Sequence, residues 1–218
     1  MRAQPLVLAK APRPGLVKTR LAATVGDDAA AELAALCLLD TIAACSAASA
    51  RCHLALAGDL AGVVLEDELR RSLIGWRVFA QQGDGLAERI AHAHATIAGP
   101  VVQVGMDTPQ VTADDLAAAD AALEDSPAVL GHADDGGWWL LGLQDPSRAG
   151  VLTDVPMSQA DTGTRTARAL LGAGLHIEVV RRLRDVDTAE DAEIVARLAP
   201  GTRFGRRWHE LPVRSPVR

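Results

Sequence analysis

The sequence has few lysines, aromatic residues and cysteines. Its 218 residues include no tyrosine, two phenylalanines, three cysteines and only two lysines. Cys37, Cys45 and Cys52 show no CxxC spacing, so they indicate buried thiols in a reducing cytoplasm, not a disulfide framework or a thiolate metal site. Both lysines, Lys10 and Lys18, lie within the first 20 residues of an arginine-rich chain. This clustering singles out the N-terminal segment as a place for function.

Long uncharged runs and an excess of positive charge are also missing. The longest stretch without Asp, Glu, Lys or Arg, Ile90 to Met106, contains a Gly-Pro break, so the sequence predicts no membrane span. The apolar run Leu6 to Ala9 is too short for a signal peptide. The net charge of -6 argues against a nucleic-acid binder. With 218 residues, 49% of them hydrophobic, the chain is long enough for one α/β domain with a sizeable core, or two small domains at most.

Apolar runs alternate with helical patterns, as in a mostly parallel sheet covered by helices. Strands are predicted at 5–10, 52–57, 76–80, 101–105, 128–133, 138–143 and 176–180. Helices are predicted at 27–48, 60–73, 86–97, 112–123, 164–171 and 188–198. We expect a single domain over residues 1–200 and a basic tail over 201–218. The composition of the tail favours a loosely ordered end over a contact between two copies in a homodimer.

The N-terminal segment AKAPRPGLVKTRL follows the first predicted strand. In open α/β sheets, ligands bind beyond the carboxyl ends of the strands. A loop carrying Lys10, Gly15, Lys18, Thr19 and Arg20 can present amide groups and positive charge to a phosphate. It is not a Walker A loop, which needs glycine directly before the lysine. Because two prolines remove amide donors, Lys18 and Arg20 are expected to supply most of the contacts.

Aspartates follow two other predicted strands. Asp107, in GMDTP, stands where a carboxylate can bind Mg²⁺ near a phosphate; the alternative role, capping the next helix, is already filled by Thr112. Asp185 and Asp187 alternate in RDVDT, so one can bind metal while the other caps a helix or holds an arginine. The sequence does not decide which.

A glycine turn, DDGGWW, joins the strands predicted at 128–133 and 138–143. Its glycines allow a tight hairpin or a close approach of backbone. One interpretation is a simple turn before a buried aromatic pair. The other makes Asp135, Gly136 and Gly137 part of a pocket wall.

Taken in order, AKAPRPGLVKTRL, GMDTPQV, DGGWWLLGL and DVDT resemble a bacterial glycosyltransferase-A-like family with the nucleotide-diphospho-sugar transferase (GT-A) fold. Its members are mostly uncharacterised, and some are described as arsenosugar-type glycosyltransferases. The family is similar in fold to molybdenum-cofactor and 2-phospho-lactate guanylyltransferases. The resemblance spans roughly residues 5–198. It implies a Rossmann-like three-layer α/β/α domain.

The resemblance also implies roles for individual residues. Lys18 and Arg20 match residues that meet nucleotide phosphates, and Asp107 matches the residue that anchors a divalent metal. Either Asp185 or Asp187 matches a second metal ligand. Asp135, Gly136 and Gly137 match the glycine turn that lines the acceptor side. Thr162 and Gly163 lie where relatives have a polar turn near the second substrate. The family pattern often has Trp-Ser after a proline where this chain has Pro156-Met157-Ser158, which leaves the acceptor open.

The implied activity is transfer from a nucleotide-activated donor, helped by Mg²⁺ or Mn²⁺. In the favoured form a glycosyl group moves from a nucleotide-sugar to a small-molecule acceptor. In the alternative a nucleotidyl group moves to a small phosphorylated acceptor and pyrophosphate leaves. A third interpretation is a nucleotide-binding protein without catalysis.

Overall fold

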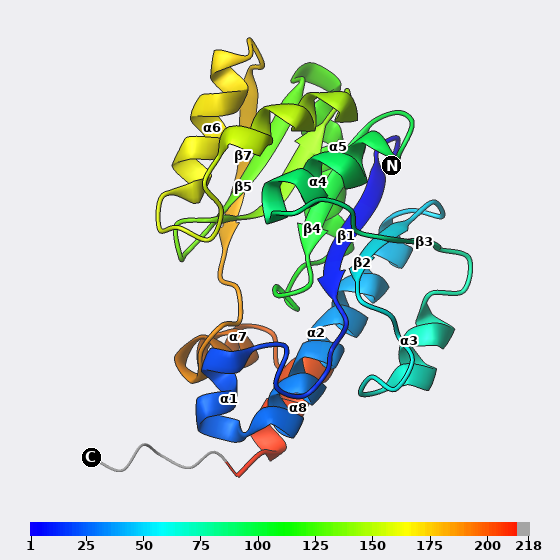
Figure 1. Cartoon of the computed structure of the whole chain (residues 1–218), viewed down its shortest axis with the longest axis vertical. Coiled ribbons are helices and arrows are strands. Elements are labelled where there is room, and N and C mark those ends of the chain that lie inside the picture. Colours follow the sequence, from blue (N-terminus) through cyan, green and yellow to red (C-terminus); the bar gives the residue numbers. More distant parts are fainter. Residues whose placement is uncertain (213–218) are drawn as a thin grey trace.

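The computed structural model describes residues 1–212 and has three layers (Figure 1). Its strands are β1 (Gln4–Lys10), β2 (His53–Ala57), β3 (Arg77–Ala80), β4 (Val101–Gly105), β5 (Ala128–Ala133), β6 (Trp138–Leu143) and β7 (Ile177–Leu183). The helices are α1 (Thr19–Val25), α2 (Asp27–Ala48), α3 (Glu66–Ser72), α4 (Leu86–Ala95), α5 (Ala113–Asp125), the 3-10 helix η1 (Pro146–Asp154), α6 (Thr162–Gly172), α7 (Ala189–Leu198) and α8 (Arg203–Glu210).

The strands form one sheet in the order β3-β2-β1-β4-β6-β5-β7. Strand β6 is antiparallel to both of its neighbours, and every other neighbouring pair is parallel. The hairpin predicted from the glycine turn is therefore confirmed. The predicted three-layer α/β/α fold with a mostly parallel sheet is also confirmed. The carboxyl ends of the parallel strands lie at one edge of this sheet, which is where such folds bind ligands.

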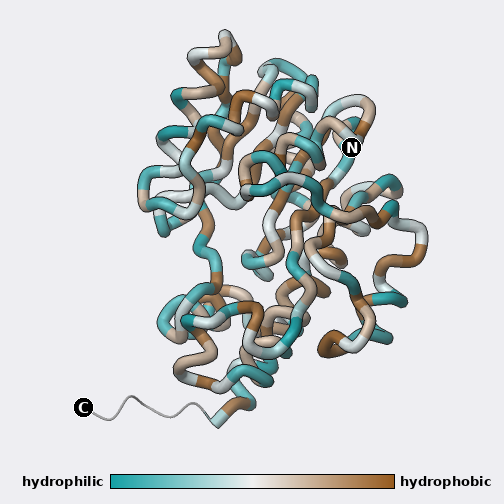
Figure 2. The backbone as a smooth tube through the Cα atoms, in the orientation of Figure 1, coloured by the Kyte–Doolittle hydropathy of each residue, from teal (hydrophilic) through white to brown (hydrophobic). Residues whose placement is uncertain are grey.

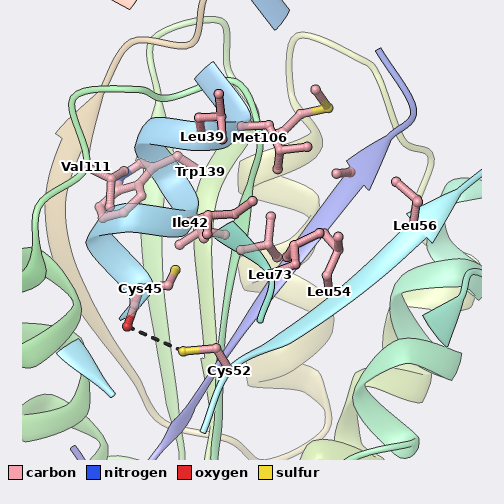
Figure 3. Packing of buried hydrophobic residues seen from close by; sticks show 14 of the residues in the cluster. Leu39, Ile42, Cys45, Cys52, Leu54, Leu56, Leu73, Met106, Val111 and Trp139 are labelled. Carbon is pink, nitrogen blue, oxygen red and sulfur yellow. Dashed lines mark hydrogen bonds between the residues drawn. The ribbon is translucent and has the colours of Figure 1, made fainter. Parts of the chain in front are cut away.

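Two apolar cores cover the two faces of the sheet. Helices α2, α3 and α5 pack on one face, and α4, η1 and α6 pack on the other. Figure 2 shows hydrophobic residues concentrated along the strands and the inner turns of the helices. Figure 3 shows the first core, where Leu39 and Ile42 of α2 face Leu54 of β2. There the Sγ of Cys52 lies 3.4 Å from the backbone oxygen of Cys45. All three cysteines are free and buried, as predicted.

Helix α2 is the exception to the predicted lack of a membrane span. Among the described residues, it is the one helix long and apolar enough to cross a membrane by length and composition. In its most apolar window 67% is buried inside the protein, which is typical of a core helix. The sequence criterion overlooked it because Glu32 and Asp40 interrupt its apolar run. Both acids form ion pairs with arginines of α8.

The expected loose tail is wrong for residues 203–210, which form α8. Phe204 and Trp208 are buried against α2 and α7, and Asp40 accepts hydrogen bonds from the backbone of Arg203 and Phe204. An amphipathic stretch with five polar residues in eight looks like a tail in sequence because its partners are distant in the chain. The rest of the predicted tail, 213–218, lies outside the described residues. The domain boundary at residue 200 stays a prediction.

One further helix prediction needs correction, and helices α1 and η1 were not predicted. The helix expected at 60–73 begins at Glu66. Asp59 accepts a hydrogen bond from the amide of Ala61, and Leu65 has a left-handed φ of 57°. The chain therefore forms turns over these residues before the helix begins. Helix α1 was not predicted at all. It lies within the N-terminal segment and bears on the site.

Candidate functional site

Lys18, Asp107 and Asp187 meet beyond the carboxyl ends of β1, β4 and β7. The Lys18 Nζ lies 2.7 Å from a carboxylate oxygen of Asp107 and 3.5 Å from one of Asp187. Arg20 binds the other oxygen of Asp187 at 2.9 Å. Three of the four sequence segments are therefore joined by ion pairs. Lys18 and Asp107, to which the sequence assigns a shared phosphate and metal site, thus lie in direct contact.

Lys18 is more buried than a phosphate-binding lysine needs to be. Its side chain is only 5% exposed, whereas that of Arg20 is 75% exposed. It is also the residue before α1, with a left-handed φ of 50° that lysine seldom adopts. Burial opposes its charge, but the carboxylates of Asp107 and Asp187 outweigh burial and raise the pKa of Lys18. Lys18 is therefore a charged residue that the two aspartates already neutralise.

Asp185 lies in the same region, held there by a backbone hydrogen bond of its neighbour Val186. The amide of Val186 donates a hydrogen bond of 2.8 Å to the backbone oxygen of Asp107, which fixes the two segments side by side. Asp185 is half-buried. Burial, and then the nearby charge of Asp135, raise its pKa to about 6. Asp185 is therefore a carboxylate whose charged form is disfavoured, first by burial and then by its neighbour Asp135.

The glycine turn packs against the start of α6. Gly136 has φ 89°, and a Cβ on it would lie 1.8 Å from the backbone oxygen of Ala160. The amide of Gly163 donates a hydrogen bond of 2.8 Å to the oxygen of Gly136. Thr162, which is 5% exposed, donates to the backbone of Pro156. Gly136 and Gly163 therefore allow the close contact between the glycine turn and the start of α6.

A cavity of about 400 Å³ opens among these segments, a volume typical of small-molecule sites. Of the residues singled out in the sequence, the cavity is lined by Lys10, Asp107, Asp135, Gly137, Thr162 and Asp185. The remaining ones lie outside its lining: Gly15, Lys18, Thr19, Arg20, Gly136, Gly163 and Asp187. Trp138 and Trp139 both line the cavity as well, and Trp139 is at the same time buried in the core.

Sequence reasoning missed the wall formed by residues 81–90. Gln81, Leu86, Arg89 and Ile90 line the cavity there. The Nε of Arg89 donates to the oxygen of Gly83 at 3.1 Å, which holds the arginine against the loop. The available signal was the GDG between the strand at 77–80 and the next helix. It has the same strand–glycine–helix pattern as a ligand loop.

The cavity has a basic wall and an acidic wall. Lys10 and Arg89 both line it, and within residues 1–212 neither takes part in an ion pair. Asp107, Asp135 and Asp185 line it as well. A ligand carrying phosphates together with a divalent cation would complement both walls.

The acidic wall does not form a metal cage by itself. Among the residues that the structure describes, no three His, Cys, Asp or Glu side chains are gathered closely enough to hold a metal ion. Mg²⁺ usually binds through one or two carboxylates and completes its shell with water and substrate phosphates. The hard oxygen donors of Asp107 and Asp185 fit that mode, and the pKa of Asp185 is raised first by burial and then by the negative charge of Asp135.

One buried polar pair lies between α4 and β4. His94 is 0% exposed, and its Nε2 lies 2.8 Å from the Oε1 of Gln103. Burial lowers the pKa of His94 to about 4, so the ring is neutral in the folded protein at pH 7. The unfolded chain takes up that proton near pH 6.5.

This difference predicts an acid-sensitive stability. The pKa of His94 is lower in the folded protein than in the unfolded chain, so protonation of the ring favours unfolding. This destabilisation is absent above pH 6.5 and grows as the pH falls to about 4. The expected loss is about 3 kcal/mol. Urea unfolding of the wild type and His94→Gln at pH 7, 5.5 and 4 measures it. The wild type should lose more stability than the variant, whereas parallel pH profiles would contradict the assignment.

Several solved structures have the same fold as this chain. A protein from Desulfovibrio desulfuricans G20, provisionally described as a nucleotide-diphospho-sugar transferase, is similar at 27% identity and a TM-score of 0.84, covering 96% of this chain and 95% of its own. A CMP:2-keto-3-deoxy-manno-octonic acid synthetase complexed with CTP is similar at 12% identity and 0.57, covering 92% and 99%. Rv0371c of Mycobacterium tuberculosis H37Rv, complexed with manganese, is similar at 20% identity and a TM-score of 0.52, covering 88% of this chain and 97% of its own. The last two likenesses concern the fold alone.

No curated protein matches the chain. A family model matches residues 38–159, more than half of the sequence, including β4, the Asp107 turn and the glycine turn. Within the nucleotide-diphospho-sugar transferase fold, the chain therefore belongs to the family described as "Uncharacterized protein conserved in bacteria (DUF2064)".

Proposed function

We propose that this protein is a transferase that uses a nucleotide-activated donor, and that it moves a glycosyl group from a nucleotide-sugar to a small acceptor. The observation that carries the proposal is the cavity itself. Free cations, Lys10 and Arg89, and the carboxylates of Asp107 and Asp185 line one space at the carboxyl ends of the strands. Phosphates and a divalent cation are the ligands that such a pair of walls would hold together.

In this proposal Asp107 and Asp185 would hold Mg²⁺ or Mn²⁺ with the donor phosphates. Such an ion would neutralise charge that develops on the leaving phosphate. Asp187 is the less suitable ligand, because Lys18 and Arg20 already bind its two oxygens and it does not line the cavity. This favours Asp185 in the choice that the sequence left open.

The phosphate contacts are assigned to Lys10 and Arg89. Lys18 is buried and neutralised by carboxylates, so its proposed part is to position Asp107. Arg20, which is exposed and bound to Asp187, would act at the rim. In this proposal Lys18 takes a positioning role in place of the phosphate contact that the sequence predicts for it.

The acceptor would enter along the glycine-turn wall, with Asp135, Gly137 and Thr162. Its hydroxyl oxygen bonds to the anomeric carbon of the donor sugar while the bond from that carbon to the phosphate oxygen breaks. The hydroxyl proton passes to a carboxylate, for which Asp135 is placed on this wall. A nucleoside diphosphate leaves.

Nucleotidyl transfer is the second candidate, and the shared fold of the CTP-bound synthetase favours it. In that reaction an acceptor phosphate oxygen attacks the α-phosphorus of a nucleoside triphosphate and pyrophosphate leaves. Incubation with UDP- or GDP-sugars, or with nucleoside triphosphates, and a panel of small acceptors separates the two. Release of nucleoside diphosphate supports the first candidate and pyrophosphate the second. Metal-dependent binding without turnover would leave the protein a non-catalytic nucleotide binder.

The basic wall gives a further testable result. Arg89→Met should weaken nucleoside diphosphate binding by about 1.5 to 3 kcal/mol, the contribution of a hydrogen bond to a charged group. Titration calorimetry in Mn²⁺ measures this. Arg168→Met is the matched control, since Arg168 is exposed on α6 outside the cavity. Equal affinities for nucleoside and nucleotide in the wild type would argue against any phosphate site here.

A further inference from the structure

The floor of the cavity contains a buried carboxamide that the proposed chemistry does not use. Gln103 is the middle residue of the central strand β4, paired with Leu6 of β1 and Leu141 of β6. Its side chain is 3% exposed and lines the cavity together with Leu8 and Ile90. Placing a glutamine in such an apolar layer costs free energy unless its polar atoms are bonded.

His94 bonds one end of this carboxamide. Its neutral ring carries a single N–H, and its Nδ1 is buried without a partner. An unpaired buried N–H is rarer and more costly than an unpaired acceptor, so the proton belongs on Nε2. Nε2 then donates to Gln103 Oε1 over the 2.8 Å contact. The amide group of Gln103 is thereby turned away from His94.

The amide group of Gln103 has no partner within the described residues 1–212. The hydrogen bond to His94 is the one that its side chain forms there. A second polar group in the same lining has no partner either: Thr108 is 2% exposed, and its Oγ1 forms no hydrogen bond. Buried donors are rarely left unpaired in folded proteins. The lining thus holds one buried hydroxyl without a partner, on Thr108, and one amide group without a protein partner, on Gln103, and a bound ligand would complete both.

We infer that Gln103 determines specificity by donating a hydrogen bond from Nε2 to an uncharged acceptor oxygen of the bound substrate, and that His94 is its positioning residue. An uncharged group fits because Leu8 and Ile90, which line the cavity together with Gln103, are apolar. A carbonyl oxygen of the donor's base and a hydroxyl oxygen of the acceptor share this chemistry. The inference rests on the proposed function.

The test compares wild type with the double variant His94→Phe/Gln103→Leu, which removes both polar groups so that neither is left unpaired. Titration calorimetry in Mn²⁺ uses UDP, CDP, GDP and ADP, with inorganic pyrophosphate as a probe that has phosphates but no base. We expect the tightest nucleotide to lose about tenfold in affinity and the preference among bases to shrink, with pyrophosphate unchanged. If the acceptor is the partner instead, nucleotide affinity is unchanged and acceptor KM rises about tenfold at nearly constant kcat.

His94 is tested by two single variants. His94→Leu should allow the Gln103 amide to rotate and reduce the selectivity, whereas His94→Gln keeps a donor for Oε1 and should restore it. Thermal unfolding of each variant separates a folding defect from a change in selectivity. Unchanged selectivity and unchanged acceptor KM in a folded double variant would overturn the inference alone. A wild type that binds no nucleotide would refute the proposed function and this inference with it.

Discussion

Asp107→Ala is expected to remove divalent-dependent nucleotide binding and to destabilise the fold at the same time. The loss of binding should exceed about 100-fold, because even residues that only support metal ligands change affinity by 10- to 100-fold. The loss of stability follows from Lys18, which is 5% exposed and loses its 2.7 Å partner. Asp187 remains at 3.5 Å, so we expect about 2 kcal/mol, less than for a fully broken buried pair.

Two aspartate variants separate these effects. Asp107→Asn keeps the shape and an acceptor for Lys18, so it should lose binding with a smaller loss of stability. Asp187→Asn should destabilise the protein through Arg20 and Lys18 but retain metal-dependent binding, because Asp187 does not line the cavity. Calorimetry in Mn²⁺ and urea unfolding measure the two quantities. Nucleotide binding by Asp107→Asn at wild-type strength would refute the metal assignment.

Gly136→Ala is expected to have the largest effect on stability of any single methyl group added to the site. The new Cβ would lie 1.8 Å from the backbone oxygen of Ala160, and the residue would keep a left-handed φ of 89°. The turn must separate from the start of α6, which should cost about 3 kcal/mol or more. Because Asp135 and Thr162 lie on either side of this contact and both line the cavity, that part of the cavity lining should be displaced as well.

Gly174→Ala is the matched control for that substitution. Gly174 has a similar φ of 78°, but nothing lies within 4 Å of the position of its Cβ. The Gly174→Ala variant should lose only about 1 kcal/mol of unfolding free energy, the cost of the backbone conformation alone. Urea unfolding compares the two. Equal losses would mean that the contact with Ala160 contributes nothing.

The site could be predicted only in part. Asp107, Asp135 and Asp185 follow strands, so their place at the sheet edge could be read from the sequence. Charge alone could not separate Lys10, which faces the cavity, from Lys18, which is buried between two aspartates. Burial depends on which loops cover a residue. Gln103 was passed over because one glutamine in an apolar strand carries no periodic signal.

The same division applies to the whole molecule. Local patterns determined the strands, most helices, the hairpin and the capping threonines Thr112 and Thr188, because these depend on neighbours a few residues away. Tertiary structure decided that 203–210 forms a helix, since Phe204 and Trp208 are buried only against helices distant in sequence. It also decided which charges pair and which face the cavity. Those outcomes depend on distances between segments some 90 to 170 residues apart, which no local pattern encodes.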